Sequence, residues 1–90
     1  MASDVPDTLL EFPCAFPIKA MGRQSPEFES IVAGIIFEHA ELVVGEELRS
    51  VASKAGNFVS VTAVIEAQSR EQLDAIYQAL TDCEQVLMAL

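Results

Sequence analysis

One histidine and two cysteines are the first side chains in this sequence to consider as metal ligands, nucleophiles or general bases. His39 lies between Glu38 and Glu41, far along the chain from Cys14 and Cys83. A metal site would need further ligands at helical spacing, and no other histidine and no nearby cysteine supplies one. No second titratable partner marks His39 as a general base. We therefore predict no metal site, and we expect His39 to cover the end of a helix, where positive charge is favourable.

The motifs that hold phosphates or nucleophiles are also absent. The sequence contains no G-x-x-x-x-G-K-[ST] loop, no G-x-G-x-x-G fingerprint and no nucleophile elbow. No cofactor is predicted, and the protein is predicted not to be an enzyme.

The stretch Lys54–Val61, KAGNFVSV, is similar to the RNP1 octapeptide of RNA-recognition modules. The three aromatic positions of that motif fall on Gly56, Phe58 and Val61, so only one of them is filled. Base stacking contributes about 1 to 3 kcal/mol per base, and most of the stacking platform is missing. A structural role is the alternative, in which Gly56 and Asn57 form a positive-φ turn and Phe58 begins a strand.

Two amphipathic helices are predicted. Ser25 is placed to cap the first helix and Pro26 to begin it, and we expect this helix to end near His39 or Ala40. The second helix, Arg70 to about Thr81, follows an S-x-x-Q capping box. Each helix has one apolar face, formed by Phe28, Ile31, Val32, Ile35 and Ile36 in the first and by Leu73, Ile76, Tyr77 and Leu80 in the second.

Four strands are predicted, most of them from period-two alternation. The expected ranges are residues 16–21 closed by Gly22, a weaker strand from about Glu47, Phe58–Ala67, and residues 86–90. Pro13 and Pro17 require an edge, a bulge or a ragged start in the first strand.

The predicted element order is strand, helix, strand, strand, helix, strand. This order indicates an α+β, ferredoxin-like βαββαβ two-layer sandwich, with antiparallel sheet order 4-1-3-2 and both helices on one face. Residues 9–90 are expected to form this single domain after a flexible leader of residues 1–8. Cys14 and Cys83 would then lie at opposite ends of neighbouring strands, beyond disulfide reach.

The sheet face without helices is the main candidate binding surface. Lys19 and Met21 of the first strand should share it with residues of the third strand, namely Phe58, Ser60, Thr62 and Val64. This is a mixed apolar and hydroxylic surface rather than a charged one, of the kind used by a sheet-to-sheet dimer or a docked helix. A partly solvated sheet face is the alternative, because antiparallel sheets often leave one face wet.

Composition narrows the classes of partner. The formal net charge is -9 and the pI is near 4.2, with only five basic residues among the 90, which disfavours nucleic acid. The first residues have neither a basic start nor an apolar run of signal length, and no window reaches the length of a membrane span. We therefore predict a cytoplasmic protein with no membrane association and reduced thiols.

Several segments together resemble the YbeD-like family of small bacterial proteins, which is catalogued as a domain of unknown function. They are LLEFPCAFPIKAMG (Leu9–Gly22), the pair His39 and Ala40, SKAGNFVSVT (Ser53–Thr62) and SREQLDAIYQAL (Ser69–Leu80). The resemblance implies a ferredoxin-like fold similar to ACT regulatory domains, a cytoplasmic bacterial location and no established activity. It also implies a link by association to lipoate metabolism, because members often lie beside genes for lipoate attachment.

Two departures from the family pattern limit what carries over. Ala55 stands where members commonly have lysine, and Glu41 stands where they have proline, so a role of the family's turn lysine does not transfer. The likeness to ACT domains draws attention to the loop at residues 22–25, because ACT domains bind amino acids near the corresponding loop. Arg23 would contact an anion there; a turn with a capping serine and a solvated arginine is the alternative.

The sequence thus predicts a non-catalytic regulatory or adaptor module. Its expected partners are a protein or a second copy, bound through the open sheet face or an edge strand, or a small anionic or amino-acid ligand. Two further hypotheses are an accessory factor of lipoate metabolism and a weak single-stranded RNA binder. The candidate binding residues are Lys19, Met21, Arg23, Phe58, Ser60 and Thr62.

Overall fold

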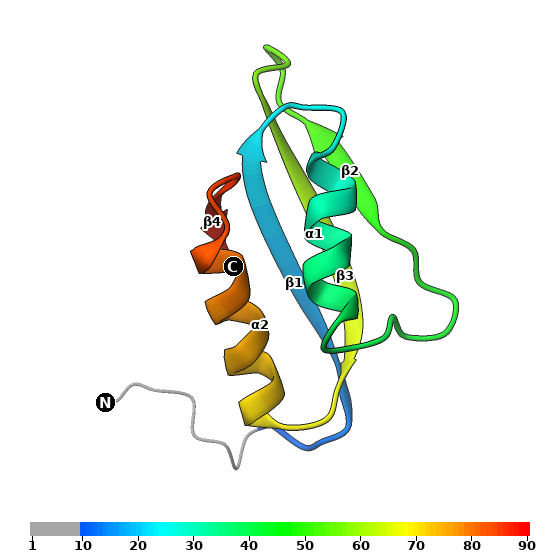
Figure 1. Cartoon of the computed structure of the whole chain (residues 1–90). Coiled ribbons are helices and arrows are strands. Elements are labelled where there is room, and N and C mark those ends of the chain that lie inside the picture. Colours follow the sequence, from blue (N-terminus) through cyan, green and yellow to red (C-terminus); the bar gives the residue numbers. More distant parts are fainter. Residues whose placement is uncertain (1–9) are drawn as a thin grey trace.

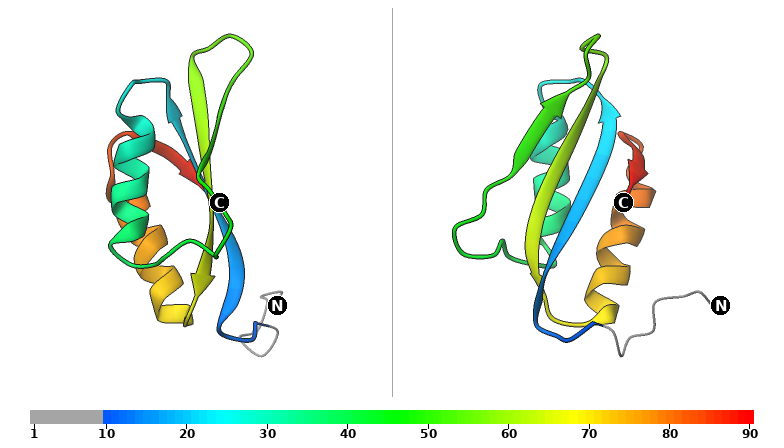
Figure 2. Two further views of the ribbon diagram at one scale, coloured as in Figure 1. Left: turned by 90° about the vertical axis from the view of Figure 1, so that its right-hand side faces the viewer. Right: turned by 180° about the vertical axis from the view of Figure 1, so that it is seen from behind.

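A computed structural model describes residues 10–90 of the chain. Its elements are β1 (Cys14–Arg23), α1 (Phe28–Phe37), β2 (Arg49–Ala52), β3 (Phe58–Ala67), α2 (Arg70–Asp82) and β4 (Val86–Ala89). The strands form one antiparallel sheet in the order β2-β3-β1-β4, and both helices cover the same face of it (Figures 1 and 2). The predicted ferredoxin-like fold and strand order are confirmed. The expected leader, residues 1–8, lies outside the described residues.

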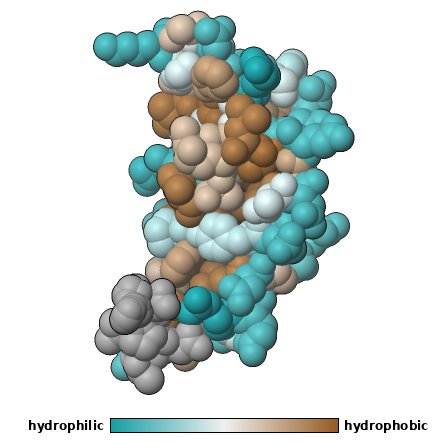
Figure 3. All heavy atoms as spheres, turned by 90° about the vertical axis from the view of Figure 1, so that its left-hand side faces the viewer, coloured by the Kyte–Doolittle hydropathy of each residue, from teal (hydrophilic) through white to brown (hydrophobic). Residues whose placement is uncertain are grey.

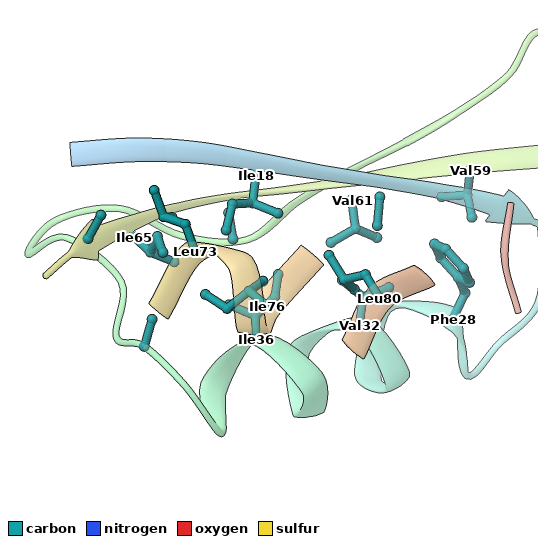
Figure 4. Packing of buried hydrophobic residues seen from close by; sticks show 14 residues of the cluster. Ile18, Phe28, Val32, Ile36, Val59, Val61, Ile65, Leu73, Ile76 and Leu80 are labelled. Carbon is teal, nitrogen blue, oxygen red and sulfur yellow. The ribbon is translucent and has the colours of Figure 1, made fainter. Parts of the chain in front are cut away.

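The hydrophobic core fills the space between the sheet and the helices (Figure 4). Alternate residues of β3 enter it, as the period-two pattern predicted, and every one of them is buried: Val59, Val61, Ala63, Ile65 and Ala67. Facing them are Phe28, Val32 and Ile36 of α1 and Leu73, Ile76 and Leu80 of α2. Full burial of a side chain of this size contributes about 1.5 to 3 kcal/mol, so this layer carries most of the fold's stability.

The two helices begin in different ways. The N-cap of α2 is Ser69, whose Oγ accepts a hydrogen bond of 3.1 Å from the Gln72 amide, as the capping box predicted. The predicted start of α1 is wrong. Its N-cap is Glu27 with no side-chain cap, because the chain first makes a turn in which the Phe28 amide donates to the Ser25 carbonyl at 3.3 Å.

Proline is tolerated in β1 because of where β4 pairs with it. Lys19 and Leu90 exchange two backbone hydrogen bonds of 3.0 and 2.8 Å, so the backbone of Lys19 points toward β4. Pro17 lies two residues before Lys19 on the same strand, so its nitrogen points to the same side. This position lies outside residues 20–22, the part of β1 that pairs with β4. Pro17 therefore removes no hydrogen bond from the ladder, and it protects a stretch of edge that no strand among residues 10–90 pairs with.

The turn between β2 and β3 differs in one respect from its prediction. Gly56 has a φ of 78°, as expected, but no described residue other than glycine has positive φ, so Asn57 does not share that role. Ser53 closes the turn instead. Its amide donates to the Phe58 carbonyl at 2.8 Å, and its Oγ accepts from the Phe58 amide at 3.2 Å.

Candidate functional site

The face of the sheet opposite the helices is uncovered within the described residues (Figure 2). Strand register brings the predicted residues together there: Lys19 lies opposite Thr62, Met21 opposite Ser60, and Arg23 opposite Phe58. Pairing with the outer strands adds Arg49, Val51 and Met88. We call this surface the open face; its residues are Ala15, Pro17, Lys19, Met21, Arg23, Arg49, Val51, Phe58, Ser60, Thr62, Val64, Glu66 and Met88.

Two neighbouring rows cross the strands of the open face. The first, the cationic row, runs from Arg49 through Thr62 to Lys19. The second, the apolar row, lies two residues nearer the β2–β3 turn and contains Val51, Ser60, Met21 and Met88. Val51 and Met88 are 65% and 52% exposed, so the apolar row is largely open to solvent.

The open face is more cationic than the sequence predicted. The expectation of an apolar and hydroxylic surface omitted Arg49, which lies on β2 directly opposite Thr62. Apolar and polar residues alternate only weakly around β2, and all four residues of β2 are exposed. The sequence pattern therefore did not reveal which residues of β2 lie on the same face as Thr62. The pairing of β2 with β3 supplies this information.

Charge is divided between the two layers of the molecule. The strands contain three basic residues, Lys19, Arg23 and Arg49, and one acidic residue, Glu66. The helices contain one basic residue, Arg70, and four acidic residues, Glu29, Glu71, Asp74 and Asp82. The strands therefore carry a net positive charge in a chain that is acidic as a whole.

Arg23 lies at the border between the open face and a small surface hollow. Its guanidinium carbon is 5.9 Å from the centroid of the Phe58 ring, a cation–π geometry. The hollow has a volume of about 260 Å³ and is lined by Arg23, Ser25, Glu84, Gln85 and Leu87. We call it the Arg23 hollow. It presents a cation, an anion and an apolar side chain at one place, as a zwitterionic ligand would require.

The outer edge of β4 is apolar. It ends the sheet, and Leu87, Met88 and Leu90 are each more than half exposed. Figure 3 looks toward this edge, where hydrophobic residues gather on the upper part of the surface while the side toward the helices is mainly hydrophilic. This edge and the open face meet at Met88.

His39 lies in the turn after α1 beside a second hollow, of about 300 Å³. Its carbonyl accepts a 2.7 Å hydrogen bond from Nε2 of Gln72, whose Oε1 accepts a 2.6 Å hydrogen bond from the Gln68 amide. Gln72 thereby ties the end of α1 to the start of α2. Within residues 10–90, no three histidine, cysteine or acidic side chains gather to hold a metal ion.

Both cysteines are free thiols. Cys14 begins β1, and Cys83 directly follows α2, with its Sγ 3.3 Å from Oε1 of Gln85. Neither helix in the described part of the chain is long and apolar enough to span a membrane.

The fold is a ferredoxin-like two-layer sandwich, in which residues 10–90 leave one sheet face uncovered. Comparison with known proteins places the chain in a family. Residues 7–90 match the family described as "Protein of unknown function (DUF493)". The chain belongs to this family, which agrees with the YbeD-like resemblance of its sequence.

Bacterial relatives cover nearly the whole chain. A UPF0250 protein of Paraburkholderia phytofirmans is 40% identical over 88 residues, covering 98% of this chain and 99% of its own. One from Neisseria gonorrhoeae is 41% identical over 83 residues, covering 92% and 91% of the two chains. One from Nitrosomonas europaea is 40% identical over 84 residues, covering 93% and 97%.

A solved structure has the same fold. The solution structure of protein HP0495 from H. pylori matches with a TM-score of 0.74 at 17% sequence identity, covering 100% of this chain and 94% of that one. At this identity the likeness concerns the fold alone.

Proposed function

We propose that this protein is a non-catalytic adaptor or regulatory module of the cytoplasm, which binds a protein partner through the open face. The observation that carries the proposal is the register of all four strands, which aligns the cationic row and the apolar row side by side on a surface that the described residues leave uncovered. An apolar area rimmed by polar and charged groups is the usual composition of a protein interface.

A pull-down from the native cell with two matched variants tests this proposal. Thr62→Lys places a long charged side chain in the middle of the open face, and Ala75→Lys makes the same change of charge on an exposed position of α2. Quantitative mass spectrometry should show partners that are retained by the wild type and by Ala75→Lys and lost by Thr62→Lys. Equal retention by all three proteins would contradict the proposal.

The same experiment addresses the accessory role in lipoate metabolism that the family resemblance implies. That hypothesis predicts that the partner lost by Thr62→Lys is an enzyme of lipoate attachment or synthesis. Recovery of an unrelated partner with the same dependence on Thr62 would keep the binding role and remove the lipoate link.

A small anionic or amino-acid ligand is the second candidate, and the Arg23 hollow supports it. Arg23 could pair with a carboxylate and Glu84 with an ammonium group, while Leu87 contacts an apolar side chain. The hypothesis predicts that one of the common amino acids raises the melting temperature of the wild type but not of Arg23→Gln. A screen in which every amino acid leaves the wild-type melting temperature unchanged would remove this candidate.

Single-stranded RNA is the third candidate, supported by the cations of the open face. It predicts salt-dependent retention of RNA that Phe58→Ala weakens. The ring of Phe58 is already approached by Arg23, and in the described strands no second aromatic residue lies on the open face. For this reason we favour a protein partner.

A further inference from the structure

We propose that the occupant of the open face is an acidic amphipathic helix of a partner protein, which lies across the strands with its carboxylates on the cationic row. This inference rests on the proposed function and specifies the chemistry of the partner. It is carried by the charges, the spacing and the composition of the two rows.

The charges of the cationic row are free to meet a partner. Arg49 and Lys19 are exposed and flank Thr62 on opposite strands, and neither forms an ion pair with a carboxylate among residues 10–90. Glu66, the acidic residue of the described strands, lies toward the far end of β3, opposite Ala15. Both cations are therefore available to the carboxylates of a partner, although the chain as a whole is acidic.

The spacing of the rows matches that of a helix. Neighbouring strands are about 4.8 Å apart, so Arg49 and Lys19, on either side of Thr62, are separated by about 10 Å. Carboxylates seven positions apart on a helix are separated by about 10.5 Å along its axis. A helix perpendicular to the strands can therefore reach both cations with two side chains of one face.

The apolar row provides the second stripe that such a helix needs. It runs parallel to the cationic row at a distance of about 6.6 Å, which is two residues along a strand. Val51, Met21 and Met88 would contact apolar side chains of the helix, and methionine adapts readily to different partner shapes. Two adjacent stripes, one acidic and one apolar, define the partner's binding face.

The composition favours this occupant over the other two that the surface could meet. RNA would need aromatic platforms, and Phe58 is the one aromatic side chain on this face in the described strands. A second copy would oppose its own cationic row to this one if the two open faces met symmetrically, which is repulsive. An acidic helix faces neither obstacle.

Site-specific photocrosslinking in the native cell tests the proposal. A benzophenone amino acid replaces Ser60, which lies within the apolar row, and in a control it replaces Ala75 on the opposite layer. The peptides captured by Ser60 should come from another protein and contain helical segments with acidic residues about seven positions apart beside an apolar stripe. Capture of the same chain, of RNA or of a segment without this pattern would overturn the proposal.

Two charge reversals sharpen the test. Arg49→Glu should lower the yield of the Ser60 crosslink about tenfold, because an attraction becomes a repulsion. Lys54→Glu makes the same change of net charge at an exposed position of the β2–β3 turn and should change the yield by less than about twofold. Lys19→Glu repeats the test on another strand, and circular dichroism confirms that each variant is folded.

The outcomes separate this inference from the proposed function. A Ser60 crosslink that resists both Arg49→Glu and Lys19→Glu would overturn the acidic helix but leave the open face as a binding surface. A Ser60 yield no higher than that of Ala75 would overturn both.

Discussion

Alternate residues of β3 face two different environments. Toward the helices, Val61, Ala63 and Ile65 are completely buried, whereas on the open face Ser60, Thr62 and Val64 are only half-buried. The backbone, the twist and the neighbouring strands are the same for both sets. The two sets therefore differ only in the face of the sheet on which they lie. The face toward the helices provides stability, and the open face is available for binding.

Substitutions on the core side should lower the free energy of unfolding whether or not a partner is present. Substitutions on the open face should leave it nearly unchanged and act on binding.

Two identical truncations on the same strand should differ most. Val61→Ala removes two methyl groups from the closed core and should cost about 2 to 3 kcal/mol, because the transfer free energy is lost and a cavity remains. Val64→Ala, on the open face, should cost less than about 1 kcal/mol. Urea unfolding followed by circular dichroism measures both values, and similar losses would refute the division.

Two glycine substitutions test how tightly the helix layer and the sheet are packed. A Cβ atom on Gly22 would collide with the carbonyl oxygen of Gln85 and with the ring of Phe28, so Gly22→Ala should cost about 1 to 3 kcal/mol. A Cβ atom on Gly34 of α1 meets nothing within 4 Å, so Gly34→Ala should add about 0.5 to 1 kcal/mol of stability. Thermal melts should shift in opposite directions; shifts of the same sign would contradict this packing.

The link between the helices should have an intermediate effect. Gln72→Ala removes the side-chain hydrogen bonds to the His39 carbonyl and the Gln68 amide, and should cost about 1 kcal/mol. Gln78→Ala is the matched control, because Gln78 bonds only to Asp82 on the exposed face of the same helix, and its loss should be close to zero. Equal midpoints of chemical denaturation for the two variants would argue against the link.

The smallest effect should appear at alkaline pH. Burial raises the pKa of Tyr77, so folding favours the neutral phenol. Its contribution to stability is complete below the ordinary value near 10 and is lost as the pH rises through the higher folded value. The free energy of unfolding should therefore fall less steeply above pH 10 in Tyr77→Phe than in the wild type. Parallel curves would show that burial of this phenol does not couple to folding.

Local patterns predicted much of the fold. Alternation along β3 identified every residue that it buries, and the Ser69 and Gln72 spacing identified the start of α2. These features depend on one segment at a time, so the sequence carries them directly. The start of α1 was predicted wrongly, because a backbone turn at Ser25 competes with the side-chain cap that the sequence favours.

The composition of the open face depended on contacts between segments. The residues predicted on β1 and β3 do meet, because both strands have clear alternation. Arg49 and Val51 were missed, since β2 is short and exposed on both sides and its register is set by pairing with β3. Met88 was missed for a similar reason: an irregularity between Met21 and Gly22 shifts the register of β4.

Hydroxyl-radical footprinting of two phenylalanines tests the open face most directly. Phe58 on the open face and Phe37 on α1 are 41% and 44% exposed, so they should react similarly in the purified protein. In native-cell extract, bound partner should protect Phe58 and leave Phe37 unchanged, as measured by mass spectrometry of the two peptides. Protection of Phe37 alone, or unchanged labelling of both residues, would contradict the assignment of the open face as the binding surface.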